Sequence, residues 1–217
     1  MAAPSKGLVA AVLVPAAVAA GAVLALDGRS SDGPRSSASS LRRLAREAET
    51  PPALQTALSP LELREGGALG TRVRPSPPAS ISIPAAGVKS KVVKAPQVDG
   101  ALEIPSVGTA GWYSGGPRPG EPGRAVIIGH LDRRKGPGLF ARVPSLDRGS
   151  AITVTDSRGR VHRYRVVGGA QARKDRFPRD EVYGYSARPV LVLVTCGGRF
   201  RRGRGYRDNV LVYARAS

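Results

Sequence analysis

One cysteine stands out among the residues that could do chemistry, because it is the only thiol in a chain of 217 residues. Cys196 follows an apolar run at 190–194, and Gly197 and Gly198 come directly after it. A lone thiol forms no internal disulfide and no multi-cysteine metal site. At the end of a buried strand, before a permissive turn, it would be held rigidly yet stay accessible, as a nucleophile requires. The alternative is a structural cysteine that packs as a small apolar side chain.

One of the two histidines also ends an apolar run. His130 follows the run 124–129, whose last residue is a glycine. An imidazole beside a thiol can protonate a leaving amine and deprotonate an incoming one. His162 lies among the alternating residues of an ordinary strand pattern, so we assign it no role. For His130 the alternative is a hydrogen-bonded structural histidine.

Arg207 precedes the last apolar run, 209–214, and lies 11 residues after Cys196 (207 − 196). Strands joined by a short, Gly-punctuated loop usually pair, so Arg207 can reach the Cys196 end of the sheet. A guanidinium there could donate hydrogen bonds to a developing oxyanion. Five arginines lie between positions 199 and 207, so a solvated surface charge is the alternative.

The elements that would position these residues are short strands. Val/Ile/Leu runs recur and Gly/Pro turns separate them, whereas no helix of three turns is indicated in the C-terminal 137 residues, 81–217. About seven or eight strands of this kind are typical of an all-β barrel or sandwich. The runs are 81–83, 101–104, 124–129, 151–155, 160–167, 189–195 and 209–214.

The start of the chain has another character. Residues 7–26 are twenty positions without a charge, close to the ~20 residues that a helix needs to cross a bilayer. We predict a membrane anchor over 1–26 with a cytoplasmic N-terminus. A cleaved signal peptide is the alternative, since small residues such as Ala20 and Ala22 suit a cleavage site.

A Ser/Pro/Arg-rich stretch follows at 27–79, and we predict a disordered spacer there. Within it, 41–56 could form a short helix that Pro51 and Pro52 would end. The folded domain is expected at 80–217.

The net charge of +18 is compatible with nucleic acid, anionic lipid or anionic wall polymers as partners. The sequence has no zinc-finger spacing and no aromatic-basic ribonucleoprotein motif, so we predict no nucleic-acid partner. A non-catalytic basic module that binds wall polymers stays open, because residues 80–217 carry 25 Lys and Arg against 10 Asp and Glu.

The order of these motifs resembles a known family. Gly-His at 129–130, Val-Thr-Cys-Gly-Gly at 194–198 and Tyr-Arg-Asp-Asn-Val at 206–210 resemble the sortases, most closely the actinobacterial class E or F. Gly-Trp-Tyr at 111–113 and the run from Pro119 to His130 are also similar to that family. The resemblance covers 81–214. Arginines at 199–202 stand where relatives often carry an acidic residue, which puts substrate preference in question.

The resemblance implies a closed eight-stranded sortase-type β-barrel with short helices or turns, preceded by the transmembrane helix and spacer. It also implies a cysteine transpeptidase of the Gram-positive cell surface. Cys196 would attack the Thr carbonyl of a Leu-Pro-x-Thr-Gly-like sorting signal and form a thioacyl enzyme, with His130 and Arg207 assisting. Asp132 and Thr195 are expected in the substrate groove or next to the trio.

The implied partners are secreted proteins with such a signal and an amino acceptor from a peptidoglycan precursor or a pilin. The membrane is a further partner through the N-terminal helix. No cofactor is implied, and no metal, because the acidic calcium-binding cluster of some class A sortases has no match here. A hydrolytic cysteine peptidase, in which water resolves the thioester, is the alternative enzyme.

Overall fold

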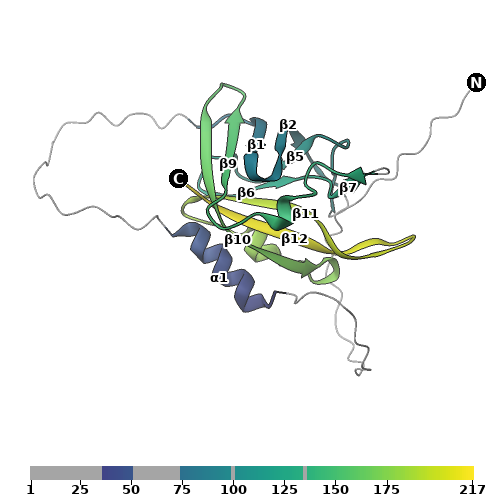
Figure 1. Cartoon of the computed structure of the whole chain (residues 1–217). Helices are drawn as coiled ribbons and strands as arrows, with labels where there is room; N and C mark the ends of the chain where they lie inside the picture. The colour runs from purple at the N-terminus through teal and green to yellow at the C-terminus, as the bar shows by residue number, and fades with distance from the viewer. Residues whose placement is uncertain (1–35, 51–73, 99–100, 134–135) are drawn as a thin grey trace, which may run out of the picture.

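The computed structural model describes residues 36–50, 74–98, 101–133 and 136–217, which are mostly strands (Figure 1). Eight strands close into a barrel in the order β1-β2-β5-β6-β11-β12-β10-β9, so the predicted eight-stranded barrel is confirmed. Only the β2–β5 and β6–β11 neighbours run parallel. The strands are β1 Pro78–Ile83, β2 Val88–Ala95, β5 Ala110–Tyr113, β6 Gly123–Ile128, β9 Ala151–Asp156, β10 Val161–Arg173, β11 Pro189–Arg201 and β12 Gly205–Ala216.

Smaller elements decorate the barrel. Two short two-stranded sheets pair β3 (Gln97–Val98) with β4 (Ala101–Leu102) and β7 (Asp132–Arg133) with β8 (Gly136–Pro137). The helices are α1 Ala38–Glu49, α2 Arg179–Tyr183 and the 3-10 turns η1 Pro84–Ala86, η2 Val143–Ser145 and η3 Lys174–Arg176.

One predicted barrel strand is wrong. The run 101–104 contributes only β4, which lies outside the barrel, and the barrel instead uses β2 and β5. β2 escapes a search for apolar runs because lysines occupy much of its exposed face. β5 contains Gly111, where a Cβ would lie 2.7 Å from the Pro105 ring, so close packing rather than an apolar run defines this strand.

Strands β11 and β12 are apolar on both faces because both faces are covered. Leu191 and Leu193 belong to the cluster that fills the barrel, together with Ile127 of β6. Val192 and Val194 alternate with them and belong to a second cluster on the outside of the barrel. This double burial explains the continuous apolar run before Cys196 and fixes the strand that carries it.

Helix α1 packs against β10 and β12 and covers the outer cluster (Figure 1). The Ser37 side chain caps its N-terminus by accepting a hydrogen bond from the Ser40 backbone N–H. Gly168 of β10 allows a close approach, because a Cβ there would lie 2.7 Å from Leu44 Cδ2. The buried face of the helix consists of Leu41, Leu44, Ala45 and Ala48.

The spacer predicted for 27–79 must therefore be corrected over 36–50. This segment is ordered because its Leu/Ala stripe meets an apolar strip that the strands leave uncovered. The spacer also ends earlier than predicted, since β1 begins at Pro78 and the Ser76 backbone N–H donates to buried Asp156 (3.1 Å). The anchor predicted for 1–26 lies outside the described residues. Within the described part of the chain, no helix is both long enough and apolar enough to cross a membrane.

The loop expected between the last two strands is instead a continuation of those strands. β11 and β12 form a hairpin that projects beyond the barrel (Figure 1). Phe200 pairs with Tyr206 across it, and their rings meet edge to face with centroids 5.2 Å apart. This cross-strand aromatic contact stabilises pairing in a segment whose other side chains are exposed.

Candidate active site

Cys196 lies on β11 where this strand leaves the barrel. Its position alternates with Thr195, so it shares the outer face with Val194. Its side chain is only 8% exposed, and burial raises the pKa of the thiol. The Lys174 ammonium opposes that shift, because Nζ lies 3.8 Å from Sγ and its positive charge favours the thiolate.

His130 follows β6, which runs parallel to β11. Ile128 is in register with Val194, and the Gly129 N–H donates to the Val194 carbonyl (3.2 Å). His130 lies two residues after Ile128, and Cys196 lies two residues after Val194. The two residues therefore lie at the same end of neighbouring strands. The His130 Nε2 is 2.9 Å from the Pro105 carbonyl oxygen. The hydrogen bonds of the His130 and Cys196 side chains in the described structure therefore lead to Pro105 and Lys174 rather than to each other.

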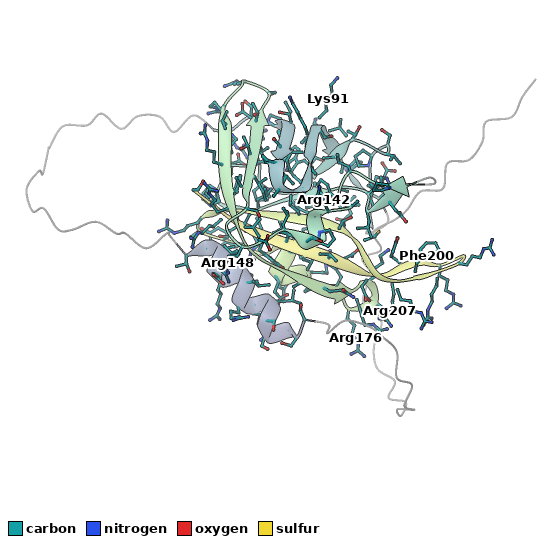
Figure 2. The ribbon with its side chains drawn as sticks, viewed as in Figure 1. Lys91, Arg142, Arg148, Arg176, Phe200 and Arg207 are labelled. Carbon is teal, nitrogen blue, oxygen red and sulfur yellow. The ribbon has the colours of Figure 1, made fainter. Side chains whose placement is uncertain are left out.

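Arg207 reaches the same end of the sheet from the other side. Asn209 of β12 pairs directly with Cys196, and Arg207 lies two residues earlier, on the same face of the strand. Its guanidinium is held by the neighbouring carboxylate, since Nε donates to Asp208 Oδ1 (3.2 Å) and a second nitrogen lies 3.5 Å from Oδ2. Figure 2 shows Arg207 on the β11–β12 hairpin, with Phe200 nearer the tip.

The carboxylate that holds Arg207 is fully buried. Asp208 Oδ2 accepts a hydrogen bond from Gln171 Nε2 of β10 (2.6 Å). Gly198 on β11 makes room for it, because a Cβ there would overlap Oδ2 and because Gly198 has a φ of +69°. A buried charge with an ionic partner and further hydrogen bonds is fixed in orientation, and it fixes the guanidinium in turn.

A family model described as the Sortase domain matches residues 81–217. The chain belongs to the sortase family. Members of this family are cysteine transpeptidases, and this sortase has one cysteine with which to act.

Solved sortases share the fold at low sequence identity. Sortase C-1 from Actinomyces oris is 19% identical with a TM-score of 0.50, over 64% of this chain and 72% of that one. Sortase A from Corynebacterium diphtheriae is 20% identical with a TM-score of 0.52, over 66% and 61%. Sortase C1 from Streptococcus agalactiae is 19% identical with a TM-score of 0.51, over 64% and 66%. This chain thus spans less than two thirds of the last two. No curated protein matches.

The two additional residues predicted for this sortase lie in different places. Asp132 of β7 accepts a hydrogen bond from the Tyr206 hydroxyl (2.8 Å), and its negative charge adds to the raised pKa of Cys196. Thr195 points to the opposite face of β11 and is fully buried. Its hydroxyl donates to the Gly129 carbonyl (2.9 Å), so Thr195 ties the cysteine strand to the residue before His130 and does not face a substrate groove.

Four residues that lie close to the predicted trio were given no role in the sequence analysis. Lys174 and Gln171 reach the site only through the fold of the barrel, and no motif marks them, whereas Tyr206 lies in the 206–210 motif but was given no role. Asn209 could have been noticed, because it is a polar residue at the head of an apolar run. It is fully buried beside Cys196, and neither atom of its amide group has a hydrogen-bond partner among the described residues.

The site offers no evident set of metal ligands. Among the residues that the structure describes, no group of three or more His, Cys, Asp or Glu side chains is arranged to hold an ion.

Proposed function

We propose that this sortase is an extracytoplasmic transpeptidase in which Cys196 is the nucleophile, His130 moves protons and Arg207 stabilises the oxyanion. The observation that carries the proposal is the strand register. β6, β11 and β12 are neighbours, and their pairing supports a common site for the three residues.

In the first half-reaction, Cys196 gives its thiol proton to His130 and the sulfur attacks the Thr carbonyl of a Leu-Pro-x-Thr-Gly-like signal. The carbonyl oxygen gains negative charge, and the Arg207 guanidinium donates hydrogen bonds to it. The C–N bond then breaks, and protonated His130 gives its proton to the departing Gly amine. The products are a thioacyl enzyme and a free C-terminal fragment.

In the second half-reaction, an amine from a peptidoglycan precursor or a pilin attacks the thioester. His130 takes the proton from the incoming amine, the C–S bond breaks, and a new amide is released. His130 must exchange its Pro105 contact for the substrate during this cycle. Because burial disfavours the thiolate, the Lys174 charge helps to keep Cys196 reactive.

The finer assignment follows the sequence motifs. Resemblance to the actinobacterial class E or F rests on the order of the motifs at 129–130, 194–198 and 206–210. The apolar run 7–26 supports a single-pass location, with the N-terminus in the cytoplasm and the barrel outside. The expected substrates are therefore secreted proteins that carry the sorting signal near their C-terminus.

The decisive experiment uses the full chain in detergent with a library of sorting-signal peptides and several amines. We expect mass spectrometry to find one preferred peptide cleaved between Thr and Gly and joined to an amine. The Cys196→Ala variant serves as the control and should give no product. Intact protein mass should show a peptidyl vinyl sulfone bound to Cys196.

Two other outcomes would contradict the proposal. Release of the Thr acid with every amine would favour the hydrolytic peptidase. No labelling of Cys196 by any peptidyl vinyl sulfone would favour the non-catalytic module that binds wall polymers.

A further inference from the structure

An open groove of about 780 Å³ runs along the solvent-facing side of α1, and none of its lining residues belongs to the thiol site. It lies between the helix and the end of β12, and its lining is strongly basic. The charged side chains that line it are Arg42, Arg43, Arg46, Arg215 and Glu47.

The single acidic side chain in this groove is already neutralised. Both terminal nitrogens of the Arg148 guanidinium bind the Glu47 carboxylate, one of them at 3.0 Å, and this contact lowers the pKa of Glu47, with smaller contributions from the charges of Arg43 and Arg215. Figure 2 shows Arg148 next to α1. The groove therefore keeps the positive charge of its arginines.

Most of these arginines are not used by the fold. Arg42 Nε lies 3.4 Å from Glu181. The side chains of Arg43, Arg46 and Arg215 make no ion pair and no hydrogen bond within the described part of the chain. Three guanidinium groups around one groove provide the forked donors that bind phosphate oxygens in pairs.

The membrane anchor proposed for 1–26, on which this inference rests, would place the groove near a membrane. Only eleven residues separate the apolar run 7–26 from the first residue of α1, Ala38. Even a fully extended chain of that length reaches roughly 40 Å. A groove tethered so closely meets lipid headgroups at a far higher effective concentration than any soluble anion.

We infer that the α1 groove, defined by Arg43, Arg46 and Arg215, binds the phosphate groups of anionic phospholipids and docks the barrel on the outer membrane surface. Lipid binding at the α1 groove would also orient the active site, because α1 is connected to it through Gln171. Ser36, just before α1, accepts a hydrogen bond from the Gln171 backbone N–H (3.2 Å), and the Gln171 side chain binds Asp208.

The test uses the full chain in nanodiscs of phosphatidylcholine, with or without phosphatidylglycerol. Arginines are modified with phenylglyoxal and the extent is read residue by residue by mass spectrometry. We expect Arg43, Arg46 and Arg215 to react about fivefold more slowly in the anionic discs, and about 0.5 M salt to remove the protection. The exposed hairpin arginines Arg202 and Arg204 are internal controls and should react equally in both.

A pair of charge-matched variants sharpens the result. R43Q/R46Q/R215Q should lose the rise in Tm that phosphatidylglycerol discs give to the parent, whereas R201Q/R202Q/R204Q should keep it. Equal protection of the hairpin arginines, or equal loss of the Tm rise in both variants, would contradict the assignment of lipid binding to the α1 groove. If soluble polyglycerol phosphate protected the groove arginines in neutral discs, the groove would bind a wall polymer, and the proposal of a phospholipid ligand would be wrong. None of these readouts depends on turnover, so an inactive enzyme would leave the inference intact.

Discussion

The base and the tip of the β11–β12 hairpin share two strands and both carry arginine, but they differ in burial. At the base, Cys196 faces Asn209, and the strands are buried on both faces. At the tip, every residue from 198 to 204 is exposed. Arg207 belongs to the base, because its side chain is only 22% exposed and a buried carboxylate holds it. Environment, not residue type, therefore separates a positioned arginine from a solvated one.

The largest effect is expected at the base from Cys196→Ala. Transpeptidation, followed by mass spectrometry, should fall to background because the only thiol is gone. The thermal unfolding curve should stay close to that of the parent, with a stability loss under about 1 kcal/mol, because the thiol lies where β11 leaves the core. Turnover by the variant would refute the nucleophile, and an unfolded variant would support the structural cysteine.

The next effect is expected from Arg207→Ala. A positioned oxyanion donor is worth about 3 kcal/mol, so kcat should fall by roughly a hundredfold or more in steady-state kinetics. Arg207→Lys should restore only part of the rate, since a point charge does not reproduce the planar fork. Full rescue by Lys would mean that only the charge of Arg207 matters.

Asp208→Asn tests what holds Arg207. The variant keeps the size of the side chain but removes the charge that orients the guanidinium, so we expect kcat to fall about tenfold and stability by about 2 kcal/mol. Asp175→Asn is the matched control, because Asp175 also pairs with an arginine, Arg173, but its side chain is 57% exposed. Kinetics and urea unfolding should distinguish the two; equal effects would remove Asp208 from the site.

The same contrast explains what the sequence could predict. β11 and β12 are recognisable because both faces are buried, which leaves unbroken apolar runs. Cys196, His130 and Arg207 could be predicted as candidate site residues because each adjoins such a run. A short helix at 41–56 was considered as well, but the docking of α1 could not be predicted, since the matching surface exists only after β10 and β12 pair.

The supporting residues were hidden for a related reason. Gln171 and Lys174 come from the end of β10 and the turn after it, and only the β10–β12 register brings them to Asp208 and Cys196. A hydrogen bond between residues 37 positions apart leaves no local pattern. β2 was missed because an exposed barrel face accepts lysine as readily as an apolar residue.

Lys174→Met should change the pH dependence of the thiol more than the rate at its plateau. Removing the cation leaves burial unopposed, so the pKa of Cys196 rises further and the alkylation profile with iodoacetamide shifts to higher pH. At neutral pH the labelling rate should fall several-fold, while Lys174→Arg should stay near the parent profile. An unchanged profile in Lys174→Met would exclude the contact with Cys196 from the reactive state.

The smallest effects are expected at the tip, from Ala at Arg199, Arg201, Arg202 or Arg204 in turn. These side chains are exposed, and a solvated charge contributes well under about 1 kcal/mol to a single interaction. Each variant should therefore alter the rate no more than a few-fold, mainly through KM for an anionic substrate.

Because such interactions are screened over a Debye length of about 8 Å at physiological salt, the differences should shrink as ionic strength rises. The loss in Arg207→Ala should persist, since the proposed donor would act on a charge in direct contact with it and its side chain is only 22% exposed. Steady-state kinetics of all five variants at low and high salt make the comparison. If one tip arginine behaved like Arg207, the hairpin would have to fold over the thiol during the reaction, and the boundary between base and tip would disappear.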